Sequence, residues 1–263
     1  MGSLYGGLFL AGLGLALGAY VSARYLKVYA VVDLVWSLGI LFGVWTLALA
    51  GGVEHPRSFF VLVVVSFWAT RLSVHLFKDR ILPRHEDPRY ANLKDRWGAQ
   101  AARNFLFLFF LQVPLAGIFL IPLCVALANP SPLGIADALA FLLALVALGG
   151  EALADRQLAG FRADPDNTGG VCREGLWAYS RHPNYFFEWL HWWVYVLLSV
   201  GVTSFGWSLL GPSIMYLFLR YITGIPPAEY SSLKRRGAAY ANYQKSTSPF
   251  FPWKPKANKP DES

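Results

Sequence analysis

The chain has 263 residues, of which 55% are hydrophobic and only 15% are charged, and it contains ten Trp and thirteen Tyr. So few charges beside so many apolar and aromatic residues exclude an ordinary soluble domain and favour a membrane protein. The net charge of +7 does not by itself indicate a nucleic-acid partner, because its distribution follows a membrane topology.

Seven apolar runs approach the ~20 residues that a helix needs to cross a ~30 Å hydrocarbon core. In chain order they cover about 4–23, 28–50, 58–77, 104–128, 133–150, 183–201 and 204–223. The first run lacks a basic leader and continues into another span, so we interpret it as a helix rather than a signal peptide. The sequence predicts an all-α, polytopic protein with one integral membrane domain over 1–263 and a disordered tail over 254–263.

Basic residues gather on one predicted face of the membrane. Seven spans place the loops 24–27, 78–103 and 151–182 on the same face as the tail 224–263, and this face holds 20 of the 23 Lys and Arg residues. By the positive-inside rule, the N-terminus is expected outside and the C-terminus in the cytoplasm. No nucleic-acid partner is expected, and the five His and two Cys residues show no metal-binding spacing.

Four charged residues remain inside the predicted spans: Asp33, Arg71, Glu188 and Arg220. At 1.5 Å per residue, each lies roughly 5–9 Å below the cytoplasmic surface, which predicts a polar cavity open to the cytosol. Two alternatives stay open. The arginines can snorkel to headgroups, or Asp33 and Glu188 can form purely structural ion pairs with them.

The predicted sixth span begins with a polar stripe. Asn184, Glu188, His191 and Tyr195 follow one another at helical spacing and so share one face. Ionisable side chains in a membrane helix are costly and usually mark a ligand cavity or an ion path. A satisfied interior histidine is the alternative for His191.

The loop 151–182 differs from a simple connector. Glu151, Asp155 and Arg162 continue the fifth span with helical spacing, and the turn-rich residues 164–170 then end it. Arginines in this loop can contact a pyrophosphate and a further phosphate, although a solvated, orientation-setting loop is the alternative. Because no P-loop and no GxGxxG motif is present, a nucleotide would be held without a Rossmann domain.

These residues resemble the steroid 5-alpha-reductase-like integral membrane proteins, and specifically their bacterial branch. The resemblance rests on Arg-His-Pro-Asn-Tyr at 181–185 with Glu188, and on the Tyr-rich stretch 240–252 that ends in Phe-Pro. Shorter similarities are Asp-Leu-Val-Trp-Ser at 33–37 and the region around Arg71. The first stretch is also similar to sterol reductases, and the family is related to isoprenylcysteine methyltransferases.

The resemblance implies an oxidoreductase of bacterial lipid or steroid metabolism in the inner membrane. It would use NADPH from the cytoplasmic side to reduce a carbon–carbon double bond conjugated to a ketone in a lipophilic, 3-oxo-4-ene steroid-like substrate. The main cofactor-binding segments fall within 151–263, with Asp155 and Arg162 at the ribose and phosphates and Asn184 and Glu188 at the nicotinamide. The full implied cofactor set is Asp155, Arg162, Arg181, His182, Asn184, Tyr185, Glu188, Arg220, Tyr240 and Tyr243.

The implied catalytic residues are Asp33, Trp68 and Glu188. Asp33 falls where the steroid enzymes carry the Glu that faces the ketone, and Trp68 stands where its partner Tyr is expected. An acidic residue of the sterol reductases is also missing from 224–227. The chemistry requires a donor to the ketone oxygen in a dry site, and burial can keep a carboxyl protonated for that purpose. We therefore expect Asp33 to be a neutral donor, with Trp68 as a second donor or a wall.

Two other functions remain open from the sequence. A membrane methyltransferase of the isoprenylcysteine carboxyl type shares an Arg-His-Pro segment but uses S-adenosylmethionine, which has no phosphate for the loop arginines. A non-enzymatic lipid-binding or transport protein would line a permeation path, but the buried charges all lie in the cytoplasmic half. Membrane lipid and a lipophilic small molecule are the expected partners, and the sequence specifies neither the substrate nor the oligomeric state.

Overall fold

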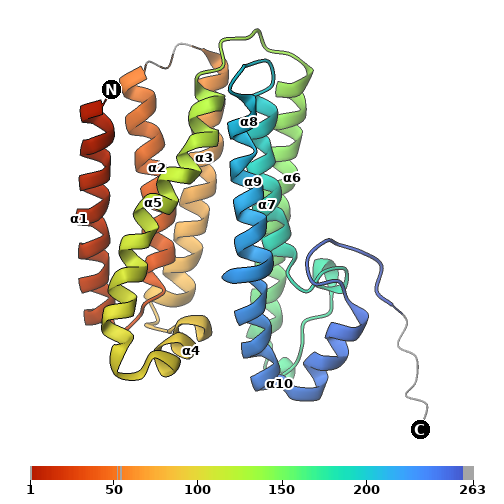
Figure 1. The fold of residues 1–263 in the computed structure, drawn as a ribbon. Coiled ribbons are helices and arrows are strands. Elements are labelled where there is room, and N and C mark those ends of the chain that lie inside the picture. Colours follow the sequence, from red (N-terminus) through yellow and green to blue (C-terminus); the bar gives the residue numbers. More distant parts are fainter. Residues whose placement is uncertain (1, 52, 54, 257–263) are drawn as a thin grey trace. The chain divides into compact units, whose positions relative to one another are not determined.

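A computed structural model describes residues 2–51, 53 and 55–256 (Figure 1). The described residues form helices and no β-strand, apart from one isolated bridge between Ser180 and Ser248. The chain divides into two compact units where we expected a single membrane domain. Unit 1 consists of Met1–Asp137 and Tyr195–Gly211, and unit 2 consists of Ala138–Val194 and Pro212–Ser263.

Unit 1 is built on four long helices that lie side by side (Figure 1). Helix α2 packs against α1, α3 and α5, and α1 also packs against α5. The elements are α1 (Gly2–Leu26), α2 (Val31–Gly51), α3 (Pro56–Leu76), the π-helical turn η1 (Phe77–Ile81), α4 (Pro88–Trp97), the 3-10 turn η2 (Gly98–Gln100), α5 (Ala101–Leu127) and α8 (Phe205–Ser208).

Local sequence signals set the ends of the short helix α4. The Asp87 carboxylate accepts a hydrogen bond from the Arg89 backbone N–H at 2.8 Å, and Pro88 occupies the first turn, where its missing N–H costs nothing. Gly98, with a φ of 48°, ends the helix in a conformation that favours glycine. These two signals turn the chain between η1 and α5.

A buried arginine fixes the opposite end of unit 1. The Arg57 guanidinium donates to both Asp137 carboxylate oxygens, at 2.6 and 2.9 Å, and to the Asn129 backbone carbonyl at 3.0 Å. Its side chain is only 3% exposed. Asn129 in turn donates to the backbone carbonyls of Leu198 and Val200. The single basic residue on the predicted outer face therefore has a structural role.

Unit 2 contains the rest of α6 (Ile135–Ala163), most of α7 (Pro183–Leu198) and α9 (Leu210–Leu217), the π-helical turn η5 (Phe218–Ile222), α10 (Ile225–Ser246), and the 3-10 turns η3 (Pro165–Asn167) and η4 (Gly175–Ala178). Helix α6 confirms that the fifth predicted span continues as a helix beyond residue 150. It ends where Asp164 and Pro165 begin η3.

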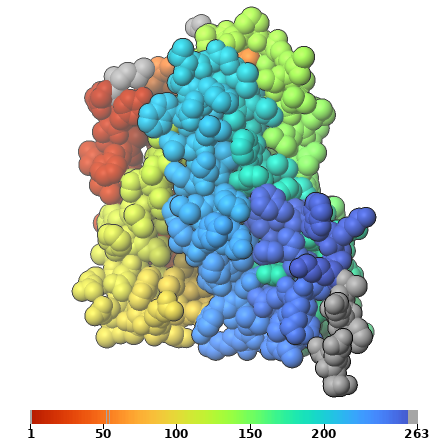
Figure 2. All heavy atoms as spheres, turned by 45° about the vertical axis from the view of Figure 1, so that its right-hand side comes forward, coloured from red at the N-terminus to blue at the C-terminus, as the bar shows by residue number. Residues whose placement is uncertain are grey.

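The residues after α10 fold back onto the segment that precedes α7. The Arg181 backbone N–H donates to the Ser248 carbonyl at 2.8 Å, and the Ser180 hydroxyl donates to the Phe250 carbonyl at 2.8 Å. In Figure 2 these dark blue C-terminal residues lie against the blue surface of α10. Of the predicted disordered tail, 254–256 has no regular structure, and 257–263 lies outside the described residues.

Six helices among the described residues are long and apolar enough to cross a membrane, which supports an integral membrane protein. The predicted span 183–201 corresponds to α7, whose 16 residues extend about 24 Å, less than a ~30 Å hydrocarbon core. Seven spans and the orientation of the termini therefore remain predictions. Helices α4 and α10 were not predicted from the sequence, which assigned their residues to a loop and to the C-terminal tail.

Candidate functional site

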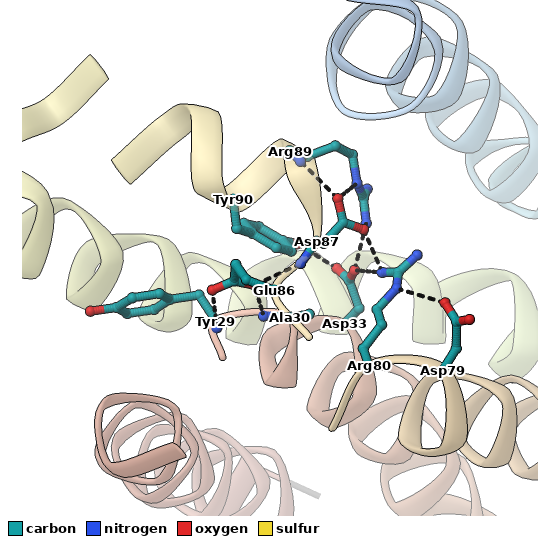
Figure 3. Close-up of polar contacts among 9 residues, drawn as sticks. All are labelled: Tyr29, Ala30, Asp33, Asp79, Arg80, Glu86, Asp87, Arg89 and Tyr90. Carbon is teal, nitrogen blue, oxygen red and sulfur yellow. Dashed lines mark hydrogen bonds and ion pairs between the residues drawn. The ribbon is translucent and has the colours of Figure 1, made fainter. Parts of the chain in front are cut away.

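A network of charged side chains closes one end of unit 1 (Figure 3). Asp33 contributes from the first turn of α2, Arg80 from η1, Asp87 from the start of α4, and Arg89 and Tyr90 from α4 itself. In Figure 3 the two guanidinium groups and the two carboxylates converge on one another. The network therefore joins three elements through alternating charges.

Asp33 acts in this network as an acceptor. Its Oδ1 accepts from the Tyr90 hydroxyl at 2.6 Å, and its Oδ2 accepts from Arg89 Nη2 at 2.8 Å and from Arg80 Nη1 at 3.2 Å. Both oxygens are thus engaged by hydrogen-bond donors. These contacts favour an acceptor over the neutral donor expected from the sequence.

The cationic partners of Asp33 also differ from those considered in the sequence. Arg71 and Arg220 were the candidates for a structural ion pair, whereas the ion pairs of Asp33 join it to Arg80 and Arg89. Asp33 and Arg71 belong to unit 1, and Glu188 and Arg220 to unit 2. The predicted common layer of four charges remains a prediction.

Two carboxylates of the loop before α4 complete the network. Asp87 is buried and forms ion pairs with Arg80 at 2.8 Å and Arg89 at 3.0 Å. Burial alone raises the pKa of Asp87, but the charges of Arg89 and Arg80 outweigh burial and hold that pKa well below its usual range. Glu86 accepts from the backbone N–H groups of Tyr29 and Ala30, at 2.6 and 3.2 Å, and burial raises its pKa.

Trp68 is fully buried in α3. Its ring meets the edge of Trp36 from α2 with centroids 5.8 Å apart, and Trp36 in turn meets Phe119 from α5 at 5.3 Å. Aromatic pairs in this edge-to-face geometry are favourable and specific. Trp68 is therefore part of a buried aromatic cluster, and the role expected for it at the substrate stays a prediction.

A cavity of about 750 Å³ lies within unit 1. Its walls come from α1, α2 and α5, with Trp207 of α8 added, and they are almost entirely apolar. Among its lining residues are Val32 and Trp36, which flank Asp33 in the sequence, and Gly39. The volume is within the ~300–1,000 Å³ range of small-molecule sites.

The Arg-His-Pro segment before α7 forms the second polar cluster, in unit 2. Arg181 Nε donates to Glu229 Oε1 at 2.6 Å, and its Nη1 donates to the backbone carbonyls of Gln244 and Thr247 at 2.9 and 2.5 Å. His182 Nε2 lies 3.4 Å from the same Glu229 oxygen. Burial lowers the pKa of His182, and Glu229 offsets part of that effect. Arg181 therefore holds α10 and its end in place, and these contacts do not favour the expected role in cofactor binding.

Tyr243 and Tyr240, from the Tyr-rich stretch, are both buried in α10. The Tyr243 hydroxyl donates to the backbone carbonyl of Trp177, and the Arg173 guanidinium lies 5.4 Å from the Tyr243 ring centre. Tyr185 stacks on His182 with ring centroids 5.2 Å apart. Arg220, in η5, lies over the ring of Tyr221 at 5.1 Å. Tyr243 has a packing role, and no contact described for these residues assigns them to a cofactor.

The polar stripe of α7 begins with Asn184, whose side-chain amide forms only part of its possible hydrogen bonds. Asn184 Nδ2 donates to Asp155 Oδ1 of α6 at 3.4 Å, whereas Asn184 Oδ1 is buried and accepts no hydrogen bond from the described residues. One turn further along α7, Glu188 accepts a hydrogen bond from Trp192 Nε1 at 3.3 Å. The structure thus brings together Asp155 and Asn184, which the sequence assigned to different parts of the cofactor.

Positive charge gathers where α6 ends and α10 passes. Arg162 and Arg235 are each close enough to Arg236 for their charges to act on it, and Arg162 and Arg236 also act on Cys172. The sequence identified Arg162 but did not identify the two α10 arginines, because α10 was not predicted as a helix. The described residues contain no group of three His, Cys, Asp or Glu side chains that could hold a metal ion.

Comparison with known families gives one match. The model of the family described as "Protein of unknown function (DUF1295)" matches residues 19–247, which is most of the chain and includes parts of both units. The comparisons with curated proteins and with solved structures find no match.

Proposed function

The chain belongs to the DUF1295 family, and for this member we propose an NADPH-dependent reduction of a carbon–carbon double bond conjugated to a ketone in a lipophilic substrate. This is the reaction of the steroid 5-alpha-reductase-like proteins that the motifs at 181–188 and 240–252 resemble. The observation that carries the proposal is the buried, unpaired amide oxygen of Asn184 beside Asp155.

The residues around Asn184 fit the carboxamide of a nicotinamide. A buried polar atom without a hydrogen bond costs about 1–3 kcal/mol, so a native site usually supplies a partner. An external N–H donor can satisfy Asn184 Oδ1, and Asp155 Oδ1 already accepts from the other end of the same amide. A nicotinamide carboxamide provides such a donor. The ammonium and adenine amino groups of S-adenosylmethionine are N–H donors too, so the choice of NADPH rests on the phosphates and on the binding test below.

The arginines at the end of α6 fit the phosphates of the same cofactor. Arg162 and Arg235 each repel Arg236, and a bound phosphate would relieve that repulsion. Arg162 is the residue that the resemblance assigns to this role. NADPH, when bound, supplies the hydride for the reduction, and a proton from water at the carbon next to the ketone completes it.

The residues of unit 1 fit the ketone end of the substrate. Arg80 uses Nε and Nη1 for its acidic partners, and Nη2 makes no hydrogen bond to the described residues (Figure 3). We assign Arg80 Nη2 as the donor that stabilises negative charge on the ketone oxygen. Asp33 then acts as a positioning residue for Arg80. Trp68 packs edge-to-face against Trp36 and so helps to exclude water from this part of unit 1.

The test is equilibrium binding of NADPH, NADH and S-adenosylmethionine to the purified full chain. We expect NADPH to bind, and Asn184→Ala to weaken that binding by on the order of tenfold or more, since a hydrogen bond in a buried site is lost. Asn242→Ala is the matched control, because Asn242 is exposed on α10. Binding of S-adenosylmethionine without NADPH would favour the methyltransferase instead.

Arg162→Ala separates the two nicotinamide cofactors. We expect this variant to lose NADPH affinity and to leave any NADH affinity unchanged, because only NADPH carries the additional phosphate. Arg156→Ala, an exposed arginine of the same helix, is its control. Equal losses for NADPH and NADH would show that Arg162 does not contact that phosphate.

A further inference from the structure

The cavity of unit 1 is long and apolar. Its lining follows α2 from Val32 to Leu47, which is about 22 Å at 1.5 Å per residue, and it follows α5 from Phe109 to Val125. A fused four-ring skeleton is shorter than this wall. Only a few lining residues carry polar side-chain atoms, among them Gln112 near one end. The shape and chemistry suit a flexible hydrocarbon chain.

The cavity begins beside the charged network. Trp36 lines the cavity and lies three residues from Asp33 on α2, so the two share neighbouring positions on the helix surface. Val32 precedes Asp33 and also lines the cavity. A molecule with an oxygen at the network and an apolar tail along α2 and α5 would match both parts of unit 1.

Glycines keep the middle of the cavity open. Gly39 of α2 and Gly117 of α5 both line it, and a Cβ built on either would meet no atom within 4 Å. Gly43, by contrast, lies against Leu120, with 2.7 Å between a built Cβ and Leu120 Cδ1. A larger side chain at Gly39 or Gly117 would therefore extend into the cavity and fill part of it.

We propose that this cavity binds the unbranched hydrocarbon tail of the substrate, so that the substrate class is a long-chain enone lipid rather than a steroid. The helices that form the walls are candidate membrane spans, so the tail would leave the bilayer hydrocarbon to enter an apolar site. This inference rests on the proposed reaction for the identity of the polar end.

The experiment uses a straight-chain enone of about eighteen carbons, whose chain length corresponds to the roughly 22 Å wall. The probe carries a photoreactive diazirine in the middle of the chain. It is cross-linked to the full chain without NADPH, and labelled peptides are mapped by mass spectrometry. We expect adducts on the lining segments of α2 and α5, and stronger competition by the unlabelled long-chain enone than by a short-chain enone or a 3-oxo-4-ene steroid.

Two variants and one control sharpen the test. Gly39→Leu and Gly117→Leu should each reduce labelling by on the order of tenfold, because the new side chain occupies the tail site. Gly14→Leu places the same side chain on an exposed part of α1 that does not line the cavity, and labelling should be unchanged.

The outcomes separate the tail site from the reaction. Adducts spread over lipid-facing helices, labelling that is insensitive to both cavity variants, or equal competition by the steroid would each overturn the tail site. Specific labelling in a protein that reduces no enone would support the tail site and count against the proposed reaction. Because the measurement needs neither cofactor nor turnover, the two failures are distinguishable.

Discussion

Arg80 is the residue on which the proposed chemistry of unit 1 most depends. Three carboxylates, from Asp33, Asp79 and Asp87, contact its Nε and Nη1, and together they fix the direction of the guanidinium. A donor held in place before the reaction stabilises developing charge without reorganisation. Pre-organisation of this kind would explain why several acids surround the cation that we propose as the contact to the ketone oxygen.

We predict that Arg80→Gln lowers kcat for enone reduction by roughly 10²–10³-fold, the range for loss of one oxyanion donor. NADPH affinity should be retained, because the predicted cofactor residues all belong to unit 2. Arg80→Lys keeps a positive charge and should recover part of kcat. Arg96→Gln, an exposed arginine on α4, should behave like the parent. Parent kcat in the Gln variant, or loss of NADPH binding with it, would contradict the role.

Asp87 couples stability to pH. Its pKa in the folded chain lies below the ordinary value of 3.8, so its stabilising contribution is complete above that value and is lost as the pH falls through the folded pKa. Asp87→Asn retains an N-cap side chain but removes the charge. We predict a loss of roughly 1.5–3 kcal/mol near pH 7, as for hydrogen bonds to charged groups.

The measurement is the thermal unfolding midpoint of the parent and of Asp87→Asn from about pH 7 to about pH 3. The difference between the two proteins should shrink as the pH falls below 4, because Asp87 of the unfolded parent then takes up a proton, whereas in the folded parent it stays charged to lower pH. A difference that stays constant over this range would show that the charge of Asp87 does not stabilise the fold.

At the scale of elements, α10 is interrupted at Gly237, whose φ of 51° and ψ of −127° are outside the helical region. Such a conformation costs a residue with a Cβ roughly 1–3 kcal/mol. A built Cβ at this position would meet no atom within 4 Å, so any penalty is conformational rather than steric. The break therefore depends on glycine itself.

We predict that Gly237→Ala destabilises the protein by about 1–3 kcal/mol. Gly160→Ala is the matched control, since Gly160 lies within helix α6 and its built Cβ also meets nothing within 4 Å. The control should be stabilised by about 0.5–1 kcal/mol, the helix preference of Ala over Gly. Unfolding midpoints of the two variants would reveal opposite shifts, and shifts of the same sign would contradict the argument.

Hydropathy located the long helices because each carries an apolar run that is independent of its neighbours. The same signal missed α4 and α10, which are mostly polar and whose termini depend on Asp87 and on Pro226 and Pro227 at the first turn of α10. The Asp33 network was missed for a different reason. Arg80 and Arg89 are 47 and 56 residues away from Asp33 in the chain, so their role depends on tertiary contacts.

In the candidate cofactor site, the segment 181–188 could be identified from the sequence because its motif consists of residues close together in the chain. Its contact with Asp155 could not be predicted, because Asn184 and Asp155 lie on different helices, 29 residues apart in the chain. Glu229, which binds Arg181, was not identified, because its helix was read as a tail. Local patterns thus located the site residues, whereas their partners required the fold.

At the scale of the whole molecule, the predicted residues are divided between the two units. All ten predicted cofactor residues fall in unit 2, whereas Asp33, Trp68 and the apolar cavity fall in unit 1. Glu188 is the one predicted catalytic residue in unit 2. Variants in one unit should therefore change cofactor affinity, and variants in the other should change substrate affinity or turnover.

The number of spans decides the orientation of the termini. Seven spans place the N- and C-termini on opposite sides of the membrane, and six place them on the same side. Helix α7 is the deciding element, because its 16 residues are short for a span and its first turn follows the polar residues Arg181 and His182. Its apolar body, with the basic loop 151–182 before it and no Lys or Arg in 199–204 after it, nevertheless favours crossing.

We predict that a fluorescent protein fused after residue 263 is fluorescent, as expected in the cytoplasm, and that alkaline phosphatase fused in the turn at 128–134 is active, as expected outside. An epitope at the N-terminus should be accessible from outside the cell. The positive-inside rule gives this outcome because 20 of 23 basic residues lie on the face assigned to the cytoplasm. If the N-terminal epitope and the C-terminal fusion both report the cytoplasm, α7 does not cross the membrane, and the polar stripe of Asn184 and Glu188 belongs to a helix that only enters it.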